Sequence, residues 1–81
     1  MRISVVGSGY VGLVSGAGLS DVWHHVVCMD IDRERVENLR KGIVPIFEPG
    51  LERMLARNAA DGRLDFTTSI EQAVEHAEVL F

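Results

Sequence analysis

The sequence predicts an α/β fold of the doubly wound type, in which helices cover both faces of a parallel sheet. Two observations lead to this prediction. Short apolar runs alternate with helical patterns along all 81 residues, and such alternation is typical of parallel sheets. The first apolar run also leads directly into Gly7, Gly9 and Gly12, whose spacing is that of a turn joining a strand to a helix.

The first half of the chain supplies two strands and two helices. Residues 2–6 are almost continuously apolar, as a strand buried on both faces requires, and a helix follows over about residues 10–19. A second strand covers residues 25–30. The second helix begins after Asp32, its N-cap, and runs to about Lys41. Its apolar stripe consists of Val36, Leu39 and Ile43.

The second half begins with a stiff loop over residues 44–50, which contains both prolines of the chain. A third helix starts at about residue 51 and closes at Asp61 and Gly62. The apolar face of this helix consists of Leu51, Met54, Leu55 and Ala59. Residues 64–67 alternate between apolar and polar, which predicts a third strand.

The last residues predict one more helix and the start of a fourth strand. Ser69 and Gln72 have the spacing of a capping box. The helix after them has an apolar face of Ile70, Ala73, Val74 and Ala77. Residues 78–81 begin the strand, which in a doubly wound sheet lies beside the first, with the ligand crevice beyond their carboxyl ends. We therefore expect a Rossmann-like sheet truncated after the start of strand 4, with residues 1–81 as the N-terminal part of one domain.

Composition and charge argue against several classes of function. The net charge of −4 speaks against a nucleic-acid or anionic-membrane surface. No apolar run approaches the roughly 18 residues of a membrane span, and we expect a cytoplasmic protein. His24, His25 and His76 lack the spacing of a metal site, so no metal ligand is predicted.

Cys28 is the one cysteine of the chain, so no internal disulfide can form. It lies in the middle of the predicted second strand, where we expect a buried, unreactive thiol. A catalytic cysteine would need an exposed, electropositive environment, which this position does not offer.

The glycine turn and Asp30 together form a dinucleotide-binding fingerprint. Gly7 allows the sharp turn, Gly9 lets a pyrophosphate approach the backbone, and Gly12 lets the helix lie close to the sheet. The helix N-terminus then faces the phosphates. Asp30, eighteen residues after Gly12, ends the second apolar run and can accept hydrogen bonds from the adenosine ribose. Its charge would repel a 2′-phosphate, so NAD is predicted rather than NADP.

Three stretches of sequence make a family resemblance specific. They are Ser4 to Val14 around the glycine turn, Cys28 to Asp32, and the loop Pro45-Ile46-Phe47-Glu48-Pro49-Gly50-Leu51. On these stretches the chain resembles the N-terminal end of the UDP-glucose/GDP-mannose 6-dehydrogenases over essentially all of its length. The resemblance implies NAD-dependent, two-step oxidation of the C6 hydroxyl of a nucleotide sugar, with UDP-glucose going to UDP-glucuronate as the expected reaction.

The resemblance also implies how the site is divided between this chain and the rest of the protein. The family's catalytic cysteine and lysine motifs do not occur in residues 1–81, so the catalytic and substrate domains are absent, no catalytic residue is predicted and the chain alone should be inactive. The missing domains would bind the sugar nucleotide, and the parent protein should be a homo-oligomer. The predicted NAD-binding residues are Gly7, Ser8, Gly9, Tyr10, Val11, Gly12, Asp30 and Arg35.

Some alternatives stay open at this stage. Arg35 either lies against the adenosine, as a Lys or Arg does in the family, or is a solvated helix residue. Tyr10 either contacts the cofactor or only begins its helix, and Glu48 either faces the crevice or is an acid favoured at a helix N-terminus. The family usually has Gly-His before the second strand, whereas Trp23 and His24 stand here, so the first helix should be capped differently.

Two other functions fit the fingerprint. One is another NAD-dependent dehydrogenase, acting on a hydroxyacid or hydroxyacyl substrate, although the Glu48-Pro49-Gly50-Leu51 loop argues against it. The other is a non-catalytic nucleotide-binding module, because function resides in sites rather than in folds.

Overall fold

A computed structural model describes residues 1–7, 9–44 and 50–81, but not the side chains of Tyr10 and Val11. The predictions made for Ser8 and Glu48 therefore lie outside the described residues. The elements in chain order are β1 (Arg2–Val6), α1 (Tyr10–Asp21), β2 (His25–Met29), α2 (Arg33–Arg40), α3 (Leu51–Ala60), β3 (Leu64–Thr67), α4 (Ile70–His76) and β4 (Val79–Leu80).

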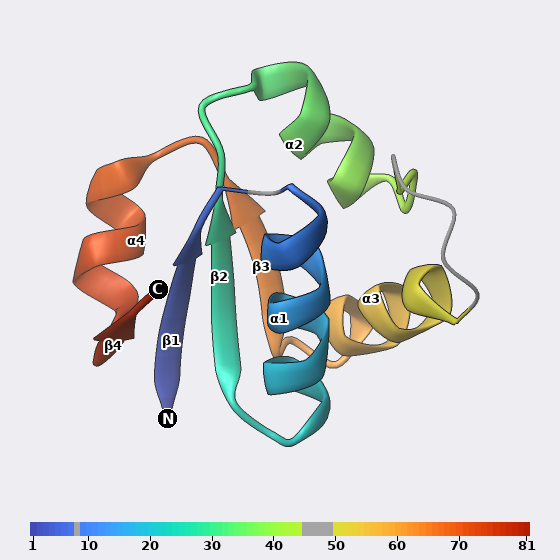
Figure 1. The fold of residues 1–81 in the computed structure, drawn as a ribbon, viewed down its shortest axis with the longest axis horizontal. Coiled ribbons are helices and arrows are strands. Elements are labelled where there is room, and N and C mark those ends of the chain that lie inside the picture. The colour runs from blue at the N-terminus through green and yellow to red at the C-terminus, as the bar shows by residue number, and fades with distance from the viewer. Residues whose placement is uncertain (8, 45–49) are drawn as a thin grey trace.

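The four strands form one parallel sheet in the order β3-β2-β1-β4. Val5 of β1 pairs with Cys28 of β2, and Cys28 pairs with Phe66 of β3. On the other side of β1, Ser4 pairs with Leu80 of β4. The predicted α/β fold is confirmed, including the position of the fourth strand beside the first (Figure 1).

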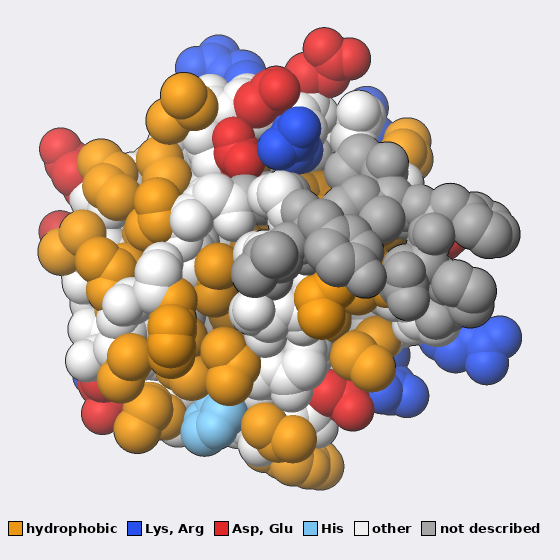
Figure 2. Space-filling model, in the orientation of Figure 1, with side chains coloured by type: hydrophobic (Ala, Val, Ile, Leu, Met, Phe, Trp, Pro, Cys, Tyr) orange, Lys and Arg blue, Asp and Glu red, His pale blue; other side chains and the backbone are white. Residues whose placement is uncertain are grey.

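The two faces of the sheet are covered unequally. On one face, apolar side chains of β1, β2 and β3 form a large cluster with buried residues of α1, α2 and α3. On the other face, α4 covers a small cluster of Val27, Met29 and Ala73. The Ser4 hydroxyl donates to the Ala73 carbonyl at 2.6 Å and fixes α4 against β1. Hydrophobic side chains remain exposed on the side of the molecule that contains α4 and β4 (Figure 2).

Some predicted apolar faces are wrong at single positions. Ile43 is exposed rather than buried, because it follows Gly42, whose positive φ of 86° ends the helical periodicity. On α3 the third buried position is Asn58, whereas Ala59 is exposed. On α4 only Ala73 is buried, and Ile70 and Val74 are exposed, because this short helix meets the sheet at Ala73.

The cap predictions are confirmed in part. Asp32 accepts from the backbone N–H of Arg35 at 3.1 Å, as an N-cap does. Ser69 accepts from the Gln72 N–H at 3.1 Å, but the reciprocal half of the capping box is wrong. The Ser69 N–H donates to the Thr67 hydroxyl oxygen, and that hydroxyl donates to Gln72 Oε1 at 3.0 Å. Thr67 therefore takes the place that a capping box gives to the Gln72 side chain.

The end of α1 also departs from the prediction. The helix reaches Asp21 rather than residue 19, and Trp23 takes the left-handed conformation, with φ of 72°, that a glycine usually supplies. The Trp23 N–H donates to the Ser20 carbonyl and the His24 N–H to the Leu19 carbonyl. This is the hydrogen-bond pattern of a Schellman motif. The expectation of a different cap is therefore wrong, since the glycine geometry is kept with a tryptophan.

Candidate functional site

Gly7 and Gly12 build the turn that joins β1 to α1. Gly7 has a positive φ of 96°, and its N–H donates to the Met29 carbonyl at 2.6 Å. A Cβ on Gly12 would overlap the carbonyl oxygen of Gly7 and would lie 3.6 Å from a methyl group of Val5. The absence of a side chain at Gly12 therefore lets α1 begin directly on the turn, and the turn is tied to the end of β2.

The N-terminus of α1 is open in the part of the chain that the structure describes. Gly9 is the N-cap, with extended backbone (φ −69°, ψ −176°), and its carbonyl accepts from the Leu13 N–H at 2.9 Å. A Cβ at Gly9 would meet no described atom within 4 Å. The first turn of α1 carries no acidic residue. The positive end of the helix dipole is thus available to an anion from outside the chain.

Asp30 lies one residue beyond the carboxyl end of β2, beside this turn. Its N–H donates to the Thr67 carbonyl at 3.0 Å, and its Oδ1 accepts from the Asp32 N–H at 2.9 Å. The side chain is 12% exposed. A carboxylate that accepts from an N–H two residues ahead forms an Asx turn, which fixes its orientation.

Arg35 pairs with this carboxylate, an arrangement that sequence reasoning missed. Its Nη1 lies 3.5 Å from Asp30 Oδ2, and its side chain is 39% exposed. The five-residue separation could have suggested the contact, since Arg35 lies in the first turns of the helix that Asp32 caps. Arg35 is therefore an ion-pair partner of Asp30 with a partly exposed guanidinium, rather than a fully solvated helix residue.

The structure brings the turn glycines and Asp30 to the same edge of the sheet, where the carboxyl ends of β1 and β2 meet (Figure 1). Tyr10 and Val11 begin α1 there. This arrangement fits a dinucleotide, because the space at Gly9 admits a pyrophosphate and Asp30 presents fixed acceptor oxygens for a ribose diol.

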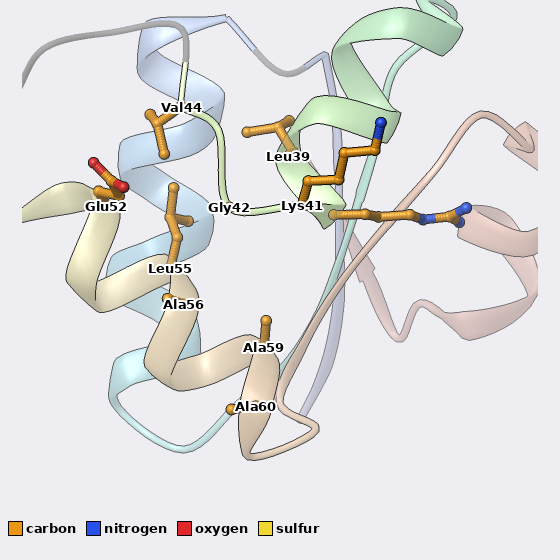
Figure 3. Close-up of a pocket in the computed structure, with 10 residues that line it drawn as sticks. Leu39, Lys41, Gly42, Val44, Glu52, Leu55, Ala56, Ala59 and Ala60 are labelled. Carbon is orange, nitrogen blue, oxygen red and sulfur yellow. The ribbon is translucent and has the colours of Figure 1, made fainter.

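A hollow of about 380 Å³ lies elsewhere, between the end of α2 and α3. Leu39, Lys41 and Leu55 are among the side chains that line it (Figure 3). No predicted site residue that the structure describes lines this hollow, so we do not include it in the candidate site.

Cys28 is fully buried, and burial together with the charge of Asp65 raises the pKa of its thiol to about 12. A Cβ on Gly16 of α1 would lie only 2.7 Å from its Sγ. The thiol is therefore protonated and inaccessible at neutral pH, which contradicts the catalytic alternative.

Two features of other functional classes are absent from the described residues. His, Cys, Asp and Glu side chains there form no group of three or more that could hold a metal ion. None of the described helices combines the length and apolarity needed to cross a bilayer.

Comparison with known proteins identifies relatives of the whole chain. The model for the NAD-binding domain of the UDP-glucose/GDP-mannose dehydrogenase family matches residues 1–81. The UDP-glucose 6-dehydrogenase YwqF of Bacillus subtilis is 54% identical over 81 residues, which are 100% of this chain and 18% of that protein. The UDP-glucose 6-dehydrogenase of Pseudomonas aeruginosa is 47% identical, with the same shares covered.

Solved structures of dehydrogenases from the same family also match the whole chain. The chain superimposes on GDP-mannose dehydrogenase of Pseudomonas aeruginosa, crystallised as a ternary complex, with a TM-score of 0.95 and 41% identity. For a UDP-glucose dehydrogenase of Pyrobaculum islandicum the TM-score is 0.92 and the identity 44%. Each comparison covers 100% of this chain and 19% of the other, so the chain spans about a fifth of the length of these relatives.

Proposed function

This chain belongs to the UDP-glucose/GDP-mannose dehydrogenase family, and on that premise we propose that it is the N-terminal part of the NAD-binding domain of a longer sugar-nucleotide dehydrogenase. Of the four relatives named above, three are UDP-glucose dehydrogenases and one is a GDP-mannose dehydrogenase. We therefore propose UDP-glucose as the substrate, with GDP-mannose as the competing candidate. A cytoplasmic, homo-oligomeric parent protein is part of the same proposal.

One observation supports NAD binding most directly. An uncapped, glycine-initiated helix and an anchored carboxylate lie at the same edge of the sheet. In the proposed complex the pyrophosphate lies against Gly7, Gly9 and the start of α1, where backbone N–H groups donate to it. Asp30 accepts from the adenosine ribose hydroxyls. Ser8, Tyr10, Val11 and Arg35 complete the proposed binding residues.

In this proposal the chain binds and orients the cofactor, and the chemistry belongs to the rest of the protein. Bound NAD supplies the hydride acceptor for oxidation of the C6 hydroxyl to a carboxylate, and two molecules of NAD are reduced as one water is consumed. The buried Cys28 thiol is unable to act as the nucleophile of such a reaction. We expect no turnover by residues 1–81 alone.

Cofactor binding is tested by calorimetric titration of NAD into the full-length protein that carries this chain and into its Gly9→Val variant. The extended backbone of Gly9 accepts valine, and no described atom occupies the space of its Cβ, so the melting temperature should change little while NAD binding is lost. Gly18→Val is the matched control, because its Cβ also meets nothing within 4 Å but lies near the far end of α1. Retained NAD affinity in Gly9→Val would show that the phosphates lie elsewhere.

The reaction is tested on the full-length protein that carries this chain. NADH absorbance is followed with UDP-glucose, with GDP-mannose and with a hydroxyacid, and the greatest turnover is expected with UDP-glucose. Binding of NAD without turnover on any of them would favour a non-catalytic nucleotide-binding module. The 81-residue chain and its Cys28→Ser variant should both be inactive.

A further inference from the structure

We infer that Asp30 masks Arg35, and that the chain carries a latent site for a 2′-phosphate on an adenosine nucleotide, which removal of the Asp30 charge would uncover. The inference rests on the proposed NAD site and deepens it. It assigns the choice between NAD and NADP to an ion pair rather than to the acid alone.

In this ion pair the Asp30 carboxylate is fixed in place, whereas the Arg35 guanidinium is partly exposed to solvent and to ligands. The Asp30 carboxylate is 12% exposed and is held by the Asp32 N–H at 2.9 Å. The Arg35 guanidinium approaches it at 3.5 Å and is 39% exposed. A guanidinium has five donors, and among the described residues Asp30 is the one acid that it meets. The partly exposed guanidinium can therefore contact a further anion.

The backbone beneath Arg35 is held independently of this pair. The Asp32 carboxylate accepts from the Arg35 N–H at 3.1 Å and caps α2. At the other end of α2, Arg40 donates from Nε and Nη2 to the Phe66 carbonyl, at 2.9 and 2.5 Å. The Asp32 cap fixes the first turn of α2, and the Arg40 contacts tie the other end of α2 to β3. The Arg35 guanidinium should therefore stay at this edge when the charge of Asp30 is removed.

The sign of the effect follows from the position of the 2′ oxygen. The proposed ribose diol donates to Asp30, so a phosphate on that oxygen would lie against a carboxylate and be repelled. With a neutral residue at position 30, the Arg35 cation that was paired with the carboxylate is left to attract the phosphate. A guanidinium matches two phosphate oxygens with two parallel donors. Asp32 stays occupied as the cap of α2.

The test is calorimetric titration of NAD, NADP and adenosine 2′,5′-bisphosphate, at low salt, into the full-length protein that carries this chain. Asp30→Asn keeps an acceptor for the Asp32 N–H and removes the charge. We expect its affinity for both 2′-phosphate ligands to rise by about 10- to 100-fold, the range of a charged hydrogen bond, and to fall again with added salt. Asp30→Asn combined with Arg35→Gln should lose this gain.

Two matched controls separate the pair from net charge. Asp32→Asn removes one negative charge two residues away and keeps a good N-cap. Arg33→Gln removes one positive charge from the exposed side of the same helix. Each should change NADP affinity by less than about threefold. Thermal melting checks every variant, and Asp30→Ser, whose hydroxyl can also accept from the Asp32 N–H, replaces Asp30→Asn if the latter unfolds.

The outcomes are distinguishable. An equal gain in Asp32→Asn, or a gain that survives Arg35→Gln, would overturn the latent site and leave the NAD site intact. So would unchanged NADP affinity in a folded Asp30→Asn protein that binds NAD. Failure of the unmodified full-length protein to bind NAD would instead overturn the proposed function, and this inference with it.

Discussion

The two edges of the sheet are built in opposite ways. At the carboxyl edge, the turn from β1 to α1 is made of glycines, and a Cβ on Gly7 or Gly9 would meet no described atom within 4 Å. At the amino edge, Arg63 precedes β3 and its guanidinium is enclosed by protein. It donates to the Ser20 carbonyl at 3.1 Å and to Asn58 Oδ1 at 2.8 Å, and it lies 4.4 Å from the ring centre of Trp23.

The difference separates the proposed binding edge from an edge whose polar groups are paired within the protein. Asn58 is fully buried, and its amide also donates to the Met54 carbonyl and to Asp21. This network satisfies its polar groups internally and joins α1, α3 and β3. The start of α1, among the described residues, has no side-chain cap, and we propose that its backbone N–H groups bind the cofactor instead. Changes at the amino edge should therefore alter stability and leave cofactor affinity unchanged.

The largest expected effect comes from Gly12, where the carboxyl edge is closed rather than open. Gly12→Ala places a Cβ onto the Gly7 carbonyl oxygen, which backbone atoms can relieve only by moving α1. We expect a loss of about 3 kcal/mol in the free energy of unfolding, at the upper end for overpacking, measured by urea denaturation. Gly18→Ala is the control, since its Cβ meets nothing within 4 Å, and it should stabilise α1 by about 0.5–1 kcal/mol. Equal stability of Gly12→Ala and the unmodified chain would contradict the described turn.

The next largest effect is expected at Asn58. Asn58→Ala removes an acceptor from Arg63 and leaves the Met54 carbonyl without the side-chain donor it has here. Because these groups are largely buried, we expect a loss of about 2–3 kcal/mol with unchanged NAD affinity. Arg53→Ala, on the exposed side of α3, should change stability by less than about 0.5 kcal/mol. A loss of NAD affinity in folded Asn58→Ala would break the separation of the two edges.

The two edges also differ in how far the sequence predicts them. The carboxyl edge can be predicted from short stretches of sequence. The glycine spacing, the acid after β2 and the cap at Asp32 are each recognisable from a few neighbouring residues. The element order follows from the alternation of apolar runs for the same reason. The five-residue separation permits the ion pair of Arg35 with Asp30 but does not predict it, because its formation also depends on the angle at which α2 leaves the sheet.

The amino edge depends on contacts between distant parts of the chain. Arg63 contacts Ser20 across 43 positions, and Asn58 contacts Asp21 across 37. An asparagine on a helix with apolar neighbours gives no sign that it is the buried residue. Nor does the apolar pattern of α4 indicate that Ile70 and Val74 are exposed, because burial there depends on what else covers the sheet.

A smaller effect at the amino edge depends on pH. Hydrogen bonds from Arg57 and then from Asn58 lower the pKa of Asp21 from its usual 3.8. A folded-state pKa below the unfolded one contributes stability above pH 3.8, and that contribution is lost as the pH falls through the folded value. Asp21→Asn and Arg57→Gln should each flatten the fall of the urea midpoint below pH 3.8. An unchanged slope in both variants would show that the acid sensitivity originates elsewhere.

The smallest expected effect sharpens the comparison at Trp23, a residue with positive φ in the closed region. A bulky side chain in the left-handed conformation costs about 1–2 kcal/mol, and the contact of its ring with Arg63 offsets about 0.5–1 kcal/mol. Trp23→Ala loses the ring contact and keeps the unfavourable φ, so it should be less stable than the unmodified chain. Trp23→Gly loses the same contact but relieves the unfavourable backbone conformation. Its free energy of unfolding, measured by urea denaturation, should therefore be about 1 kcal/mol higher than that of Trp23→Ala. If the two variants are equally stable, the left-handed conformation of residue 23 does not destabilise the protein. If Trp23→Gly is less stable than Trp23→Ala, the extra backbone entropy that glycine loses on folding outweighs any relief of the left-handed conformation.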